Sequence, residues 1–203
     1  MMSDDAWKAA WDPVVAAVGR DFSDGASEGA DAVERGLVRR YLEPLEFDCP
    51  LHYDDAAAEA HGYGGMIAPY SSYLAFAVAP IWSPGDAPVF TSDERDAQPA
   101  RAAIRPPASG LEPPYTGYFA TDFEIEFLAP LSLGDRVSRS GMRLASCEPK
   151  ETRVGRGAFV GWEWDLVNQR GEEVAQIRVA LFLYNPRETS SEQAVEAAAA
   201  GRS

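Results

Sequence analysis

The chain has 203 residues, of which 46% are apolar, so it can bury the core of one domain. Its formal net charge of −14 argues against nucleic acid or an anionic membrane as the main partner. With two cysteines and two histidines in all, we expect neither a disulfide framework nor a metal site.

The N-terminus and the apolar runs bear on location. The opening MMSDDAWKAAW lacks the basic segment and apolar stretch of a signal peptide, and no apolar run reaches the length of a membrane span. We therefore expect a cytoplasmic protein without a membrane partner.

Three helices are predicted in the first third of the chain. Residues 3 to 18 form an amphipathic pattern, and a loop rich in Gly, Ser and Asp follows over residues 20 to 31. The second helix has Asp31 as its cap and ends at Pro44, and a short third helix covers about 53 to 61. The apolar faces are Trp7, Trp11, Val14, Val15 and Val18 in the first helix, and Val33, Leu37, Val38 and Tyr41 in the second.

A fourth helix, buried nearly all round, is predicted over about residues 69 to 80, where the run PYSSYLAFAVAPIW carries no charge. Pro69 suits its first position, and the N–H groups of Tyr70 and Ser71 would then be unpaired at the helix start. Such donors can bind a carbonyl oxygen or an oxyanion. The alternative is a core helix, preceded by a loop containing Gly62, Gly64 and Gly65, that binds nothing.

The second half of the chain changes from helical to alternating patterning. Residues 83 to 117 are dense in Pro, Gly and charge, and they form either a surface excursion or a loop that covers substrate or contacts a partner. Four strands are predicted after this loop, at residues 119–128, 136–147, 158–168 and 173–184. The order predicts an α+β domain with the buried helix on one face of an antiparallel sheet. A second sheet, from a like or unlike subunit, would cover the open edge.

Three segments resemble one known family: DCPLHYDDAAAEAHGYGGMIAP, FEIEFLAPLSLGDRV and GAFVGWEWDLVNQRGEEVA. Their order and spacing are similar to those of the MaoC-like acyl-CoA hydratases and dehydratases, in the subgroup that resembles the dehydratase region of fungal-type fatty acid synthase. The resemblance implies the hotdog fold, an antiparallel sheet wrapped around a long central helix. We assign residues 1–30 to an N-terminal extension, 31–186 to the hotdog domain and 187–203 to a disordered tail.

The chemistry that the resemblance implies is the reversible addition of water to a 2-enoyl thioester. In the family, a carboxylate and a histidine activate the water, and a backbone N–H at the helix start polarises the thioester carbonyl. The family histidine falls on His52, and the helix-start N–H falls on Tyr70, eighteen positions later. No cofactor is implied. The residues expected to contact the acyl thioester are Phe47, Tyr63, Gly65, Met66, Pro69 and Ser71.

The carboxylate position departs from the family pattern. The residue five positions before His52 is Phe47, and the family asparagine is Cys49. Asp48 lies one position away and serves as the catalytic base only if this turn is rebuilt, because a general base must come within hydrogen-bond reach of its proton. Otherwise the chain resembles half of an enzyme whose partner carries the catalytic pair. His61 is expected to be a solvated residue.

Three functions therefore stay open at the level of the sequence. The first is a hydratase or dehydratase, or a subunit of one, acting on a thioester of coenzyme A or of an acyl carrier. The second is a non-catalytic hotdog subunit that binds an acyl thioester or stabilises a catalytic MaoC-like partner. The third is a thioesterase. In each case we expect a homodimer, or a heterodimer with another MaoC-like subunit.

Overall fold

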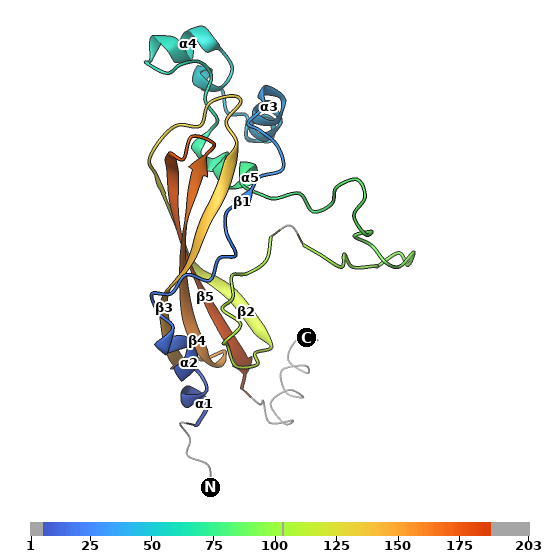
Figure 1. Ribbon diagram of the computed structural model, residues 1–203, viewed down its shortest axis with the longest axis vertical. Helices are drawn as coiled ribbons and strands as arrows, with labels where there is room; N and C mark the ends of the chain where they lie inside the picture. The colour runs from blue at the N-terminus through green and yellow to red at the C-terminus, as the bar shows by residue number, and fades with distance from the viewer. Residues whose placement is uncertain (1–5, 103, 188–203) are drawn as a thin grey trace, which may run out of the picture.

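The computed structural model describes residues 6–102 and 104–187. Its centre is a five-stranded sheet of antiparallel pairs in the order β1-β3-β4-β5-β2. The sheet is long and strongly twisted, with helices gathered at both ends (Figure 1). The predicted α+β class with an antiparallel sheet is confirmed. The strands are β1 Ser27–Glu28, β2 Gly117–Phe127, β3 Val137–Glu151, β4 Gly155–Asn168 and β5 Glu173–Pro186.

Strands β3, β4 and β5 form a meander, and β4 and β5 carry its core. Trp162, Trp164 and Leu166 alternate along β4 toward one face, where they are buried. The turn into β5 is closed by Asn168, whose side-chain oxygen accepts hydrogen bonds from the N–H groups of Arg170 and Glu172. The four predicted strands are confirmed, and each observed strand end lies within four residues of the predicted one. The short β1, which pairs with β3, was not predicted.

Strand β2 lies at the edge of the sheet and pairs only with β5. The alternating apolar and polar residues of β2 are typical of a strand with one buried face, but most of its side chains are exposed on both faces. Its register shifts between Ala120 and Asp122, so the aromatic residues before and after the shift face opposite sides. Phe119 lies opposite Phe182 on one face, and Phe123 lies opposite Val179 on the other.

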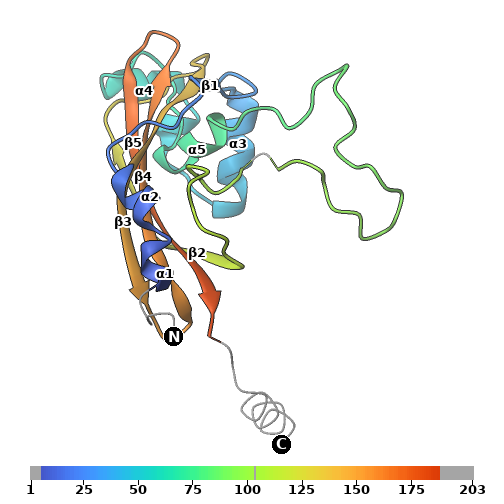
Figure 2. The ribbon, with the colours of Figure 1, turned by 60° about the horizontal axis from the view of Figure 1, so that its bottom comes forward.

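The predicted N-terminal helix is divided into two short helices, α1 Ala6–Ala9 and α2 Asp12–Ala16. Pro13 lacks the N–H that a continuous helix would need, and it begins the second helix instead. Trp11, Val14 and Ala17 are buried against the sheet, whereas Val15 and Val18, assigned to the apolar face, are exposed. Figure 2 shows α2 lying along β3.

The helices α3 Arg35–Leu42 and α4 Asp55–Ala60 lie at the opposite end of the sheet (Figure 1). Asp31 was wrong as a cap, since Glu34 precedes α3 and Val33 is held in the sheet layer by a bond from its N–H to the Asp135 carbonyl. Leu37, assigned to the apolar face, is exposed. Single 3₁₀ turns follow α3 at Glu43–Leu45 (η1) and Pro50–His52 (η2), and Asp54 caps α4 by accepting from Ala56 N–H at 2.9 Å.

The central helix is much shorter than predicted. It consists of a 3₁₀ turn, η3 Tyr70–Ser72, and α5 Tyr73–Phe76, so the predicted helix of about 69 to 80 was wrong beyond Phe76. The segment after β1 lies beside the chain there. A Cβ on Gly29 would stand 1.9 Å from the Phe76 carbonyl oxygen, and the Ala30 N–H donates to the Val78 carbonyl at 2.9 Å. Pro80 also disfavours a helical residue before it.

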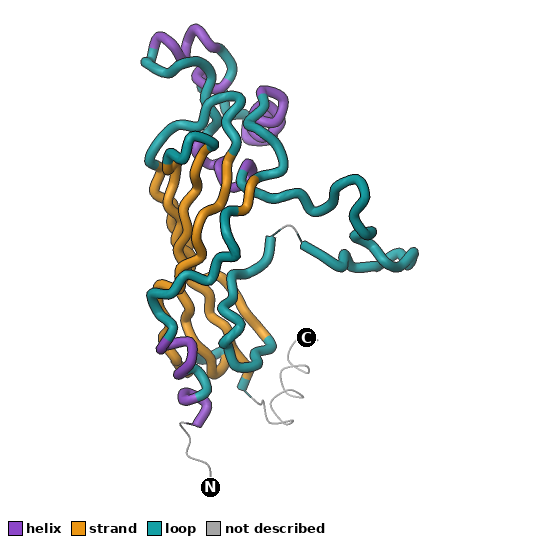
Figure 3. The backbone as a smooth tube through the Cα atoms, viewed as in Figure 1, coloured by secondary structure: helices purple, strands orange, loops and turns teal. Residues whose placement is uncertain are grey.

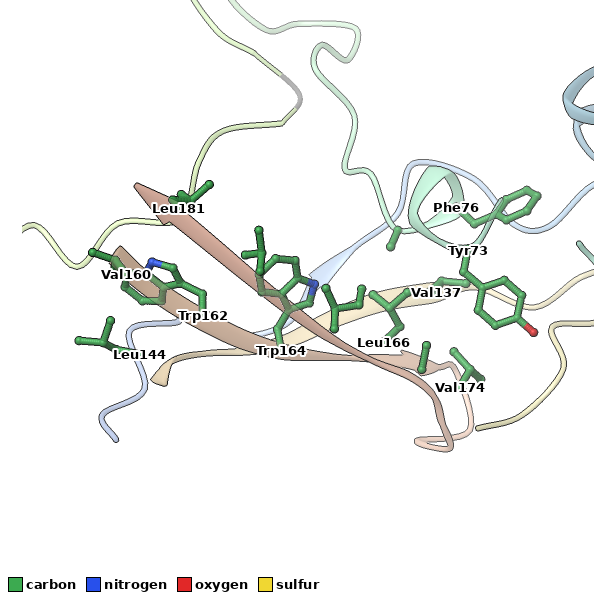
Figure 4. Packing of buried hydrophobic residues seen from close by; sticks show 14 of the residues in the cluster. Tyr73, Phe76, Val137, Leu144, Val160, Trp162, Trp164, Leu166, Val174 and Leu181 are labelled. Carbon is green, nitrogen blue, oxygen red and sulfur yellow. The ribbon is translucent and has the colours of Figure 1, made fainter. Parts of the chain in front are cut away.

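Between Phe76 and Gly117 the described residues form neither helix nor strand, as predicted for residues 83 to 117. The chain leaves the body as a wide excursion and returns at β2 (Figure 3). The core lies between the sheet and the N-terminal segments and helices. Figure 4 shows Tyr73 and Phe76 at one end of a row of buried side chains that runs through Leu166 and Trp164 toward Leu144. The predicted tail falls, apart from Arg187, outside the described residues.

Candidate active site

The start of the central helix is fixed by Tyr73, which is fully buried. Its hydroxyl donates to the Ala129 carbonyl and accepts from the Leu131 N–H, both at 2.8 Å. Burial raises the pKa of Tyr73, so the hydroxyl stays protonated and remains a donor. The hydroxyl of the preceding residue, Ser72, donates to the Pro69 carbonyl at 2.6 Å. The two Tyr73 bonds tie the helix start to the segment before β3.

Tyr70 and Ser71 occupy the first turn, as predicted, so their N–H groups have no acceptor within the helix. The Tyr70 ring packs against Tyr73 and Phe127, with centroids 5.4 and 5.0 Å away. The Ser71 carbonyl accepts a bond from the Tyr41 hydroxyl at 2.8 Å. The helix is too short for a large macrodipole, so any oxyanion stabilisation here rests on the individual N–H donors.

His52 is 7% exposed at the end of the 3₁₀ turn η2, and its Nδ1 lies 2.9 Å from the Ile67 carbonyl oxygen. Because a carbonyl can only accept, Nδ1 carries the proton and Nε2 of the neutral ring is left with a lone pair. The ring lines a cavity of about 280 Å³ together with Tyr53, Met66 and residues of α3. A neutral His52 therefore has one nitrogen that can take a proton.

The side chain found against His52 is Phe47, with ring centroids 5.8 Å apart. Phe47 is 48% exposed, and its carbonyl accepts a bond from the Tyr53 hydroxyl at 2.8 Å. Asp48 lines a separate cavity of about 490 Å³, formed with Phe47, Pro50 and their neighbours, in which His52 takes no part. The structure thus groups His52 with the aromatic residue at the carboxylate position rather than with Asp48.

Asp55 has a role that the sequence did not reveal. Its carboxylate accepts from the Met66 N–H at 3.0 Å and from the Arg35 guanidinium at 2.5 Å. The Met66 bond and then the Arg35 bond lower the pKa of Asp55, so the carboxylate stays ionised. This anchor holds the tight bend at Gly65, whose φ of +138° favours glycine.

The other predicted thioester contacts do not share one cavity. Met66 lines the His52 cavity and Phe47 lines the Asp48 cavity, while Pro69 is buried and Ser71 is exposed. Tyr63 is half-buried at the end of α4, where its N–H bonds the Ala58 carbonyl. His61 is exposed as expected.

Another cavity, of about 400 Å³ and mainly apolar, lies where the central helix stops, and it was not predicted from the sequence. It is enclosed by the sheet face that a longer helix would have covered, by the chain after Phe76, and by residues 104–107 of the long loop. Arg139 and Trp164 belong to its wall. The remaining lining residues are Ser27, Leu74, Ala77, Val78, Ala79, Ile104, Arg105, Pro106, Pro107, Tyr118, Phe123, Val179 and Leu181.

Within residues 6–102 and 104–187 there is no group of three or more His, Cys, Asp or Glu side chains placed to hold a metal ion. Over the same residues, no helix has both the length and the apolar character needed to cross a membrane.

The class follows from this architecture: an antiparallel sheet curved around a central helix, with a histidine before the helix start, is a hotdog fold. Solved structures share it. One chain of the ChsH1-ChsH2 complex from Mycobacterium tuberculosis superposes with a TM-score of 0.61 at 22% identity, covering 90% of this chain and 93% of that one. The MaoC-like dehydratase from Rhodospirillum rubrum gives 0.52 at 21% identity, covering 83% and 93%. The predicted hotdog fold is confirmed.

The chain belongs to the family described as FAS1-like, dehydratase domain region, which matches residues 16–177. A curated relative from Thermomonospora curvata, named a probable enoyl-CoA hydratase alpha subunit, is 29% identical over 172 residues. That match covers 85% of this chain and 51% of the relative. The 3-oxo-4,17-pregnadiene-20-carboxyl-CoA hydratase alpha subunit of Mycobacterium tuberculosis is 26% identical, with coverages of 77% and 46%. The chain spans about half the length of the curated relatives it matches, and the predicted MaoC-like resemblance is confirmed.

Proposed function

We propose that this chain is one subunit of a hydratase or dehydratase that adds water reversibly to the 2-enoyl thioester of coenzyme A. In this proposal the carboxylate–histidine pair that activates the water belongs to a partner subunit of the same fold. The observation that carries the proposal is the Phe47 ring against His52, at the position where the family has its carboxylate. An aromatic ring can bind an acyl chain, but it cannot accept a proton from water.

The relatives support the reaction class and the need for a partner. Both curated relatives are named as alpha subunits of CoA-thioester hydratases, and a structural neighbour is part of a two-protein complex. Hydration leaves the oxidation balance unchanged: the water oxygen bonds to C3 of the enoyl group and a proton goes to C2. The chemistry therefore needs an acid–base pair and carbonyl polarisation, and no redox cofactor.

This chain would supply binding and polarisation. The Tyr70 N–H remains our predicted donor to the thioester carbonyl, and Phe47, Tyr63, Gly65, Met66, Pro69 and Ser71 remain the predicted wall of the acyl thioester site. The Ile67 bond leaves Nε2 of His52 able to accept a proton, so His52 together with Asp48 is the competing assignment for the catalytic pair.

The open edge of β2 is the surface that we propose for the partner. Its backbone groups on the outer side are unpaired in the sheet, and Phe119, Phe123 and Phe127 are exposed along it. Edge strands with exposed aromatic side chains are sites of strand addition and of association. A partner sheet that pairs here would continue the sheet and cover these rings.

The direct test measures loss of enoyl absorbance with a series of 2-enoyl-CoA thioesters. We expect no turnover by the chain alone, and turnover when it is combined with a MaoC-like chain that has an intact Asp and His. His52→Ala and Asp48→Asn in this chain should then leave most of the combined rate. Turnover by the chain alone that both substitutions abolish would assign the pair to Asp48 and His52 instead. No turnover in any combination would leave a non-catalytic binding subunit.

The docking surface has its own test. Phe123→Glu should abolish co-purification with the MaoC-like partner, because it places a charge on the face that the partner would cover. Val154→Glu, at an exposed apolar residue in the turn before β4, is the matched control and should leave the complex intact. Equal retention of the complex by both variants would move the interface away from β2.

A further inference from the structure

Arg139 is a charged residue in the wall of a mainly apolar cavity. It faces the central-helix side of β3, with its Cα opposite Ser27 of β1 and Leu166 of β4. The cavity is lined mainly by Leu74, Val179 and similar side chains, and its volume of about 400 Å³ is within the range of small-molecule sites. A half-buried guanidinium in such surroundings needs an acceptor or an anion.

Among the described residues no carboxylate lines this cavity, although the chain has 32 acidic residues and 18 basic ones. The lining contains two cationic side chains, Arg139 and, from the long loop, Arg105. In a protein with a net charge of −14, a cavity without any acid and with two arginines is a local reversal of sign. The cavity therefore favours an anionic group over a cationic one.

Arg139 differs from the other arginines of the sheet. Arg136 pairs with Glu28, Arg143 with Glu163, and Arg178 with Glu163 and Glu124. The Arg139 side chain has no ion pair or hydrogen bond among the described residues, and its contact is with the face of the Trp164 ring, 4.6 Å from the centroid. Burial lowers the pKa of Arg139, but an arginine remains charged at any physiological pH.

The wall behind Arg139 holds a second donor without an acceptor. Trp164 is 8% exposed, and its indole N–H is buried with no hydrogen-bond partner among the described residues. Leaving a buried donor unpaired is costly, so native proteins rarely do so. The N–H is closed off from solvent, so Arg139 is the donor that a ligand in the cavity can reach.

We propose that this cavity binds an apolar acyl group that carries a carboxylate, and that the Arg139 guanidinium binds that carboxylate. The cavity adjoins the C-terminal end of the central helix, and the proposed thioester site is at its start. Seven residues of helix separate the two ends by about 10 Å. The carboxylate would therefore be at the far end of the acyl group from the thioester, a step that rests on the proposed function.

The first experiment needs no thioester. Decanoate and decanamide have the same carbon chain, and they differ in charge at the head group. Calorimetric titration of the purified chain should show decanoate binding roughly 10- to 100-fold more tightly than decanamide, the range for a hydrogen bond to a charged group. Arg139→Gln should remove that preference and leave decanamide binding within about 2-fold.

The control is Arg143→Gln, on the same strand but paired with Glu163 on the opposite face, which should keep the full preference. Equal affinity for decanoate and decanamide on the unaltered chain, or binding of neither, would overturn the proposal without any variant. So would a preference that survives Arg139→Gln.

A second experiment tests whether the carboxylate is at the far end of the acyl group from the thioester. The mono-CoA thioester of decanedioic acid should bind at least 10-fold more tightly than decanoyl-CoA, and Arg139→Gln should bring the two together. Equal binding of the two thioesters, with decanoate still preferred over decanamide, would overturn the distal position. Hydration of enoyl-CoA is measured separately, so a failure of the hydratase proposal is distinguishable from a failure of this one.

Discussion

At the start of α5 the Tyr73 hydroxyl has two hydrogen-bond partners. In the wall of the cavity beyond Phe76, by contrast, neither the Arg139 guanidinium nor the buried indole N–H of Trp164 has a hydrogen-bond partner among the described residues. Seven residues separate these two environments. The first is closed by buried side chains and hydrogen bonds to the segment before β3. The second is bounded by a loop and by an incompletely covered sheet. Packing and hydrogen bonds around Tyr73 stabilise the start of the helix, whereas its C-terminal end borders an open cavity.

The largest effect on stability should come from Tyr73→Ala. It removes a fully buried ring together with the hydroxyl that joins Ala129 and Leu131, and we expect a loss of about 3–5 kcal/mol in the free energy of unfolding. Urea unfolding measures it. Tyr70→Ala is the control, because this ring is partly exposed, and it should cost about 1 kcal/mol. Equal losses of unfolding free energy in the two variants would mean that the start of the central helix is not stabilised mainly by Tyr73.

Asp135→Asn should weaken the same end in a pH-dependent way. Burial opposes ionisation of Asp135, but bonds from Arg170, the Ser132 N–H and Gln169 outweigh it and lower its pKa. The ionised form thus stabilises the fold above the ordinary pKa of 3.8, and this contribution is lost as the pH falls through the lowered value. We expect a cost of about 1.5–3 kcal/mol at neutral pH.

The pH series distinguishes this explanation from a simple packing defect. The difference in unfolding free energy between the unaltered chain and Asp135→Asn should shrink below pH 3.8, because the protonated aspartic acid loses the same charge-assisted bonds. A difference that stays constant down to low pH would show that the amide fails for steric reasons.

Gly29→Ala tests why the helix stops at Phe76. The added Cβ would stand 1.9 Å from the Phe76 carbonyl oxygen, a backbone contact that no rotamer change can relieve. We expect a loss of about 1–3 kcal/mol. Gly36→Ala, in α3 with open space around it, should instead stabilise by about 0.5–1 kcal/mol. An unchanged or higher stability of Gly29→Ala would remove this contact as the cause.

The smallest change in stability should come from filling the cavity beyond Phe76. Ala79→Phe adds a ring at the cavity wall, where Ala79 is half-buried, and should alter the unfolding free energy by no more than about 0.5 kcal/mol. The same variant should bind decanoate at least 10-fold more weakly, since the ring occupies the cavity. Unfolding and titration on one preparation measure both quantities. A large loss of stability with unchanged decanoate binding would contradict both expectations.

What the sequence predicted was local. The short helix over about residues 53 to 61, the start of the central helix next to Pro69 and the alternating strands each depend on residues within a few positions of one another. The features that were not predicted from the sequence depend on contacts between segments far apart in the chain. The helix ends where the chain after β1, some forty-seven residues earlier, lies against it, and Asp55 holds Met66 across a loop.

The candidate site divides in the same way. His52 and Phe47 could be placed by spacing, and the structure puts their rings together. The cavity around Arg139 could not be predicted, because it is formed by all five strands, the end of the central helix and the long loop. Hydrophobic periodicity and residue propensity describe single helices and strands. They do not predict a cavity whose shape depends on where several elements end relative to one another.

The edge strand β2 carries three acids, Asp122, Glu124 and Glu126, on the face opposite Phe123. If β2 paired antiparallel with a copy of itself about Glu124, Glu124 would face Glu124, and Asp122 would face Glu126. Like charges directly across two strands are destabilising, and Arg178 offsets only part of this charge. A foreign strand with basic side chains at those positions would meet no such repulsion. The charges on β2 thus favour pairing with a strand of a different protein over pairing with a second copy of this chain.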